Sequence, residues 1–116
     1  MLLDWLTLYY TKNIGSKRLM QLVAHFDSAT HAVNASNSDW KKAGMNELVI
    51  ASRDPIAIKK AESALNWLEA SQLHHIVIVT DDAYPELLRV SDDPPALLFA
   101  KGNINVSYVH TSYFVF

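Results

Sequence analysis

Hydrophobic residues in the first part of the chain recur at helical spacing and are separated by turn-forming residues. Residues 2–10 form a predominantly apolar run without glycine or proline, which predicts a short, largely buried helix. A second apolar face follows at positions i, i+3, i+4 and i+7 and consists of Leu19, Leu22, Val23 and Phe26. This spacing places the four side chains on one side of a helix.

A short turn joins these two predicted helices. Asn13 and Gly15 both tolerate a positive φ angle, so the segment predicts a tight turn rather than a linker. Ser16 follows the turn and is the expected N-cap of the second helix. Two helices joined by a short turn with an aliphatic residue, here Ile14, and a glycine form a helix-hairpin-helix pattern.

Further short helices are predicted by residues that commonly cap helix N-termini. The caps and their segments are Ser28 before residues 29–35, Ser36 or Ser38 before Trp40, and Asn46 before residues 47–52. Each segment is too short to be a stable helix alone, so each must pack against its neighbours. Asp54-Pro55 marks the clearest boundary, because an aspartate N-cap is followed by proline at the first helical position.

After Asp54-Pro55 the hydrophobic pattern changes from helical to extended. An amphipathic helix ending near residue 71 is predicted by Ile58, Ala61, Leu65 and Leu68. Residues 74–80 are rich in β-branched side chains and are bounded by Asp81-Asp82, which predicts a buried strand. The remaining predicted elements are one or two helical turns over residues 84–89, a rigid turn over residues 92–95 and a second strand over residues 96–100.

The change from helices to strands predicts an α/β chain with two structural units. We expect an all-α helical domain over residues 1–72, followed by a unit of β-α-β order over residues 73–116. Two or three strands without further partners expose sheet edges and an apolar face. From about His74 onward we therefore expect either low stability in isolation or burial through self-association.

Charge is distributed unevenly although the net charge is only −2. Residues 1–26 hold three Lys and Arg residues against one Asp, a local balance of +2. Residues 80–93 hold five carboxylates against one arginine, a local balance of −4. Because nucleic-acid binding depends on neutralising phosphates with cations, any such contact belongs at the front of the chain.

Several classes of site and location are excluded or disfavoured by composition. The chain has no cysteine, which excludes disulfides, thiolate metal sites and a cysteine nucleophile and fits a reducing cytoplasm. The N-terminus lacks the basic region of a signal peptide, and no apolar stretch is long enough to span a membrane. We expect a cytoplasmic chain without a membrane segment.

No chemistry of catalysis or metal binding is expected. His74 and His75 are adjacent on a predicted strand, so their side chains point to opposite faces and cannot share an ion. The pairs Asp81-Asp82 and Asp92-Asp93 fit capping and turn roles rather than paired catalytic carboxylates. No Gly-x-Ser-x-Gly, P-loop or Gly-x-Gly-x-x-Gly motif occurs. We therefore expect a protein that is not an enzyme, with no metal and no cofactor.

A string of motifs in the second unit resembles the DprA/Smf family of DNA-processing proteins. The string is Tyr84-Pro85-x-Leu87-Leu88 followed by Asp93-Pro94-Pro95-x-Leu97-Leu98-Phe99-x-x-Gly102. The front of the chain is similar too, at Trp5-Leu6, at Ile14-Gly15-Ser16-Lys17-Arg18 and at Trp67-Leu68. The resemblance covers residues 5–102 and implies an N-terminal SAM-like helical domain followed by the start of a Rossmann-like domain.

The same resemblance implies a function, but the end of the sequence lacks a motif that the family carries. The family binds single-stranded DNA and delivers it to the RecA-type recombinase during natural transformation and recombination. Its members carry an Ile-Val-Gly-Ser-Arg type motif shortly after the position of Gly102, whereas no glycine follows Gly102 here. We expect a truncation or frameshift near residues 104–106, or a fragment, and an apolar tail over residues 104–116 with no clear role.

The candidate site residues fall into two groups. At the hairpin, Ile14, Gly15, Lys17 and Arg18 are placed to face a phosphate through backbone N–H groups and positive charge. The alternative is that Gly15 only makes the turn, Ile14 only contacts the core, and both cations are solvated. The second group is expected to be structural and consists of Tyr84, Pro85, Leu87, Leu88, Pro94, Pro95, Leu98, Phe99 and Gly102.

Two functional hypotheses therefore stay open. In the first, the chain assists single-stranded DNA binding through the hairpin. In the second, the helical domain contacts itself, a recombinase or a regulator and does not bind DNA. Trp5, Trp40 and Trp67 lie among apolar helical positions, so we expect core packing rather than base stacking. The remaining lysine pairs, Lys41-Lys42 and Lys59-Lys60, are expected to be solvated.

Overall fold

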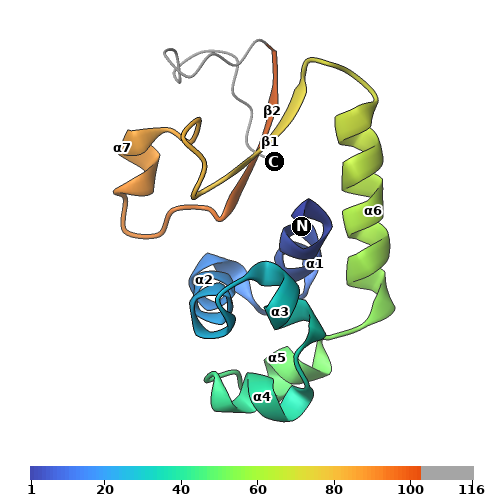
Figure 1. The fold of residues 1–116 in the computed structure, drawn as a ribbon, viewed down its shortest axis with the longest axis vertical. Helices are drawn as coiled ribbons and strands as arrows, with labels where there is room; N and C mark the ends of the chain where they lie inside the picture. The colour runs from blue at the N-terminus through green and yellow to red at the C-terminus, as the bar shows by residue number, and fades with distance from the viewer. Residues whose placement is uncertain (103–116) are drawn as a thin grey trace. The chain divides into compact units, whose positions relative to one another are not determined.

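The computed structural model describes residues 1–102 of the chain (Figure 1). The chain divides into two compact units, Met1–Leu65 and a second unit that begins at Asn66. The elements in chain order are α1 (Leu2–Tyr10), α2 (Gly15–Phe26), α3 (Ala29–Asn34), α4 (Asn37–Lys42), α5 (Glu47–Ala51), α6 (Pro55–Glu69), β1 (His74–Ile78), α7 (Glu86–Arg89) and β2 (Leu97–Lys101). The predicted α/β class, with helices first and strands after, is confirmed. The predicted boundary after residue 72 stays a prediction.

The first unit is helical and has a common apolar core. Helix α3 packs against both α1 and α2, α1 packs against α2, and α4 packs against α5. The large side chains that are almost completely buried in this unit are Leu6, Leu8, Leu19, Leu22, Trp40 and Val49. Because no helix among α3, α4 and α5 exceeds six residues, their stability depends on this shared core.

Side-chain caps define where the short helices begin. The Oγ of Ser28 accepts a hydrogen bond from the His31 N–H at 3.0 Å, and the Oγ of Ser36 accepts one from Asp39 at 3.1 Å. Asn46 caps α5 in the same way, with its Oδ1 3.0 Å from the Val49 nitrogen. The predicted caps are confirmed, and Ser36 rather than Ser38 begins α4.

Two predictions of local detail are wrong. Helix α2 begins at Gly15 with Ile14 as its N-cap residue, so Ser16 lies inside the first turn and is not the cap. The predicted amphipathic helix is present as α6 and Ala61 is fully buried, but Ile58 is 44% exposed and Ala57 and Ala64 complete the buried face instead. The buried positions of α6 thus hold small side chains, which a pattern of large apolar residues does not reveal.

The second unit contains a two-stranded antiparallel sheet. Strands β1 and β2 pair from His74 opposite Lys101 to Ile78 opposite Leu97. The predicted order of strand, helix and strand is present, with α7 in the connection (Figure 1). The antiparallel pairing differs from the parallel pairing of a Rossmann βαβ unit, so the Rossmann-like continuation stays a prediction. The expectations for residues 104–116 lie outside the described residues.

Candidate functional site

The turn between α1 and α2 contains two residues in the left-handed conformation. Asn13 has φ 69° and Gly15 has φ 66°, so the chain reverses direction within a few residues, as predicted. Ile14, between them, is only 4% exposed and anchors the turn to the core. A Cβ atom on Gly15 would meet no atom within 4 Å. The requirement for glycine is therefore conformational and not steric.

Hydrogen bonds hold this turn in place from both sides. The Nη1 of Arg18 donates to the carbonyl oxygen of Asn13 at 3.0 Å. The Nδ2 of Asn13 donates to the Oγ of Ser52 at 2.8 Å, and that hydroxyl donates to the Leu48 carbonyl oxygen at 2.8 Å. Arg18 is thus partly committed to the shape of the turn, and the turn is tied to the end of α5.

The N-cap position of α2 differs from those of α3, α4 and α5, where Ser28, Ser36 and Asn46 accept capping hydrogen bonds. Its N-cap residue is Ile14, whose side chain makes no capping hydrogen bond, and the first turn contains no acidic residue. The exposed first turn carries Lys17, and neither it nor the nearby exposed Lys12 is hydrogen-bonded or ion-paired within residues 1–102. An uncapped helix N-terminus beside positive charge is a favourable environment for an anion.

The carboxylate closest in sequence to this turn is neutralised within the helical unit. Asp4 accepts a hydrogen bond of 2.6 Å from the Oγ1 of Thr30 and pairs with the N-terminal ammonium group at 3.2 Å. The predicted positive balance of the front of the chain is therefore carried by exposed side chains: Lys12, Lys17 and Arg18. We call these three residues the hairpin cations.

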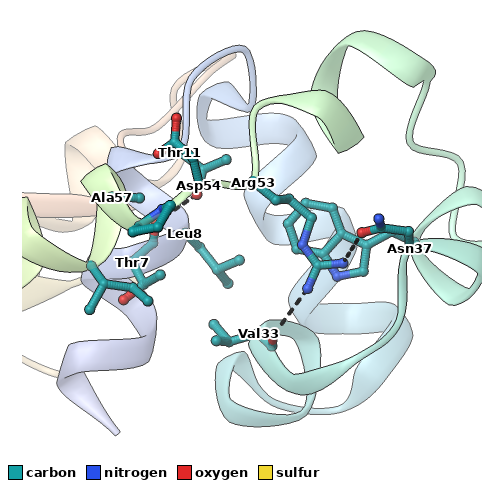
Figure 2. A pocket seen from close by; sticks show the side chains of 11 residues that line it. Thr7, Leu8, Thr11, Val33, Asn37, Arg53, Asp54 and Ala57 are labelled. Carbon is teal, nitrogen blue, oxygen red and sulfur yellow. Dashed lines mark hydrogen bonds between the residues drawn. The ribbon is translucent and has the colours of Figure 1, made fainter.

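A cavity of about 380 Å³ lies elsewhere in the first unit and was not predicted from the sequence (Figure 2). It lies between α1, the segment from α3 to α4, and the start of α6. Its apolar lining includes Leu8, Val33, Trp40 and Ala57, and its polar lining includes Asn37, Arg53 and Asp54. The volume falls in the range of small-molecule sites.

Arg53 is the principal charged group of this cavity. Its Nη1 donates to the Oδ1 of Asn37 at 2.8 Å, and its Nη2 donates to the carbonyl oxygens of Val33 at 3.1 Å and Ala35 at 2.8 Å. The guanidinium carbon lies 4.0 Å from the ring centroid of Trp40. Arg53 therefore joins the C-terminal end of α3, where a cation is favoured by the helix dipole, to the start of α4.

Among residues 1–102, no carboxylate forms an ion pair with Arg53. Burial lowers the pKa of Arg53 from its usual value, although a guanidinium stays protonated in proteins. Within the part of the chain that the structure describes, no carboxylate lies within ion-pair distance of it. The Oδ1 of the neighbouring Asp54 accepts a hydrogen bond from Ile56 at 3.0 Å instead.

Comparison with protein families connects this helical unit to a known group. A family model described as the DprA-like N-terminal HHH domain matches residues 1–61. The chain belongs to the DprA family. No curated protein and no solved structure matches it. The match covers the hairpin, all four hairpin candidates and the cavity, whereas the sequence resemblance depended chiefly on residues 84–102.

The motif string over residues 84–102 includes an arginine that was not singled out as a site residue from the sequence. The Nε of Arg89 donates to the Val79 carbonyl oxygen at 3.0 Å and its Nη2 to the Asp81 carbonyl oxygen at 2.6 Å. Arg89 also forms an ion pair with Glu86. It thus joins the end of β1 to α7. The available signal was one cation within a strongly acidic segment.

Tyr84 makes a second contact within the segment that connects β1 to β2. It is 2% exposed, and its hydroxyl donates to the Pro95 carbonyl oxygen at 2.7 Å. Burial raises the pKa of Tyr84 above its usual value, and the nearby Arg89 guanidinium opposes that rise. The net effect is a raised pKa, so the phenol is neutral at physiological pH and can donate its proton to the Pro95 carbonyl oxygen.

The other DprA-motif residues differ in exposure. Leu98 and Phe99 are buried in β2, whereas Leu87 on α7 is 89% exposed. Gly102 has φ 114°, and its N–H donates to the Leu73 carbonyl oxygen at 2.8 Å. The prolines and the remaining leucine are half-buried: Pro85, Leu88, Pro94 and Pro95. Leu87 is thus by far the most exposed residue of the predicted structural group, and the structural role of the group stays a prediction.

The two adjacent histidines make separate contacts within the second unit. The Nδ1 of His74 lies 2.6 Å from the Trp67 carbonyl oxygen, and the two rings stack at 4.2 Å. The Nε2 of His75 lies 2.7 Å from the Gly102 carbonyl oxygen. Residues 1–102 contain no group of three His, Asp or Glu side chains placed to hold a metal ion, and no helix among them is long and apolar enough to cross a membrane.

Proposed function

We propose that this chain is the N-terminal part of a cytoplasmic DNA-processing protein that acts in natural transformation and recombination. In this role it assists the binding of single-stranded DNA and its delivery to a RecA-type recombinase. The observation that carries the proposal is the hairpin of a DprA-family helical domain, with an uncapped α2 N-terminus beside Lys12 and Lys17. The role is one of binding and assigns no chemical step to the chain.

The hairpin would bind DNA through its phosphates and not through its bases. Backbone N–H groups at the start of α2 supply hydrogen-bond donors, and Lys17 supplies charge. Arg18 mainly holds the turn through its bond to Asn13. A site of this size neutralises two or three phosphates, so the affinity of the domain alone is expected to be weak and to fall steeply with salt, with a slope of about −0.7 per contact.

A charge-reversal experiment with a matched control tests this proposal. The purified full chain is titrated against a fluorescently labelled oligothymidylate at several salt concentrations, and anisotropy reports binding. Lys17→Glu should weaken binding several-fold and reduce the salt slope by about one contact. Lys42→Glu makes the same charge change on α4 and should leave most of the binding intact. Equal loss in both variants would mean that only net charge matters and would contradict the hairpin site.

A second candidate function is protein contact without DNA binding. It is favoured by the net charge of −2 and by the exposed apolar residues Leu87 and Val90, which lie one turn apart at 89% and 69% exposure. Exposed carboxylates flank them in the sequence at positions 81, 82, 86, 92 and 93. This acidic, apolar surface would bind a basic-rimmed site on a recombinase or on a second copy of the chain.

Sedimentation velocity separates the two candidates. The chain is examined alone over a concentration series and then mixed with the RecA-type recombinase of the same host. Association that is lost in Leu87→Asp but unaffected in Lys17→Glu supports protein contact through α7. If the chain stays monomeric and does not co-sediment with the recombinase, the protein-contact candidate fails.

A further inference from the structure

The cavity in the helical unit has a flat cation as part of its wall. One face of the Arg53 guanidinium lies against the Trp40 ring at 4.0 Å. The Trp40 ring itself is only 1% exposed, and its Nε1 donates to the Ala32 carbonyl oxygen at 2.7 Å. Arg53 is partly exposed and lines the cavity. Because the other face is covered by the ring, the guanidinium face opposite Trp40 is the surface that Arg53 can present to a ligand.

The hydrogen bonds of Arg53 limit what that ligand can be. A phosphate or carboxylate is normally held by the in-plane N–H groups of a guanidinium. Here both terminal nitrogens already donate to neutral protein acceptors on α4 and at the end of α3. The adjacent Asp54 adds a negative charge at the cavity, which further disfavours an anion. A metal cation is disfavoured by the guanidinium charge.

A planar π system fits the surface that remains. Guanidinium faces stack on aromatic rings and on nucleobases. The three bonds to Asn37, Val33 and Ala35 hold the guanidinium plane in one orientation, so little side-chain freedom is lost on stacking. The cavity also offers one carboxylate oxygen on Asp54 and the Nδ2 group of Asn37, an acceptor and a donor for the edge of a base.

We propose that this cavity receives an unstacked nucleobase of single-stranded DNA, which stacks on the outer face of Arg53. The inference rests on the proposed DNA-binding function and adds to it a base contact separate from the hairpin cations. Trp40 acts indirectly, as the buried ring that supports the guanidinium. Trp40 can therefore pack in the core, as expected, while Arg53 provides the surface on which a base stacks.

NMR titration of the ¹⁵N-labelled full chain tests the site with a defined probe. The probe is deoxyadenosine 5′-monophosphate, and 2-deoxyribose 5-phosphate is the control without a base. The Trp40 Nε1–H and Arg53 Nε–H signals should shift with the nucleotide, saturate in the millimolar range and not move with the sugar phosphate. Equal shifts with both compounds, or no shift at either signal, would overturn the base site.

Two substitutions of neighbouring isoleucines on α6 provide a matched pair. Ile58 lines the cavity and Ile56 does not, and both are about half exposed, at 44% and 54%. Ile58→Trp fills the cavity without removing a contact of Arg53, so nucleotide binding should weaken about tenfold or more. Ile56→Trp should bind like the parent chain. Arg53→Lys keeps the charge but removes the flat face, and it should also lose binding. Parent-like nucleotide binding by Ile58→Trp overturns the proposal.

Oligonucleotides distinguish failure of this site from failure of the proposed function. Adenine-containing and abasic single strands of equal length are compared for the parent chain and for Ile58→Trp. If both strands bind alike and the substitution has no effect, the result supports DNA binding by the chain and contradicts the base site. If the mononucleotide shifts the Trp40 and Arg53 signals but neither strand binds, the proposed DNA binding is wrong and single-stranded DNA is rejected as the ligand.

Discussion

The backbone of Ile78 and the side chain of Asp81 close the outer edge of strand β1. The Ile78 N–H donates to the Oδ2 of Asp81 at 2.8 Å, and the Asp81 N–H donates back to the Ile78 carbonyl oxygen at 2.8 Å. Gly102 donates to Leu73 and Val79 donates to Ala96 across the two strands. In this register the backbone N–H of Ile78 points away from β2. At the other end of the strand, the outward N–H of His74 donates to the Ser71 carbonyl oxygen at 3.2 Å.

This arrangement predicts that Asp81 limits edge-to-edge association. Unpaired strand edges are templates for pairing with another chain. Asp81→Ala would free the Ile78 N–H, which lies on the same strand edge as the backbone N–H of Ile76. A second chain could then pair with this edge, so self-association should increase. Sedimentation velocity over a concentration series measures the effect. Asp82→Ala is the control, because it makes the same charge change at an exposed position without a hydrogen bond in the described part of the chain. Equal behaviour of the two variants would reject this role.

A second prediction concerns the choice between two serines at the start of α4. Ser36 accepts a hydrogen bond from Asp39, whereas Ser38 lies exposed inside the helix. Ser36→Ala should lower the free energy of unfolding by about 1 kcal/mol, the usual cost of losing an N-cap. Ser38→Ala should change it little, because alanine is a better helix former. Urea denaturation followed by tryptophan fluorescence measures both, and a larger loss in Ser38→Ala would contradict the assignment.

Features set by neighbouring residues could be predicted from the sequence. The caps at Ser28 and Asn46 and the left-handed turn at Asn13 and Gly15 depend on side-chain chemistry within a few positions. The start of α2 was predicted wrongly because Ser16 resembles an N-cap in isolation. The turn instead ends on the buried Ile14, whose packing in the core determines where the helix starts.

The cavity and the two arginine contacts could not be predicted, because they join distant parts of the chain. Arg53 binds acceptors between sixteen and twenty positions away. Arg89 binds backbone carbonyls that become available only after β1 ends and the chain turns. From the sequence alone, Arg53 and Arg89 cannot be distinguished from solvated surface arginines. The exposure of Leu87 likewise depends on which side of α7 is covered, and a helix of four residues is too short to show this by periodicity.

Substitution by alanine should lower the unfolding free energy by different amounts at Gly15 and at Gly44. Gly15 has φ 66° and open space around its Cβ position, so Gly15→Ala should cost about 1 kcal/mol of unfolding free energy through backbone strain alone. A Cβ on Gly44, at φ 100°, would lie 2.5 Å from the Nε2 of Gln21, which donates to the Ala43 carbonyl oxygen at 2.8 Å. Gly44→Ala therefore adds the loss of that bond and should cost more. Thermal unfolding gives the order, and equal costs would contradict it.

The last prediction is a pH dependence at Tyr84. Burial raises the pKa of this phenol in the folded chain, so folding favours its neutral form. The resulting stability is fully present below the ordinary tyrosine pKa of about 10 and is lost as pH rises through the folded value. Tyr84→Phe removes the titrating group and the bond to Pro95, at a cost of about 1 kcal/mol at neutral pH.

Unfolding free energies at pH 7 and at alkaline pH, for the parent chain and for Tyr84→Phe, check both effects. The difference between the two proteins should shrink as pH rises through the range in which Tyr84 ionises, because the parent loses the stabilisation that the variant already lacks. Tyr10→Phe corrects for other phenols, since burial also raises the pKa of Tyr10. If the difference between the parent and Tyr84→Phe is the same at both pH values, the hydroxyl of Tyr84 is not linked to folding.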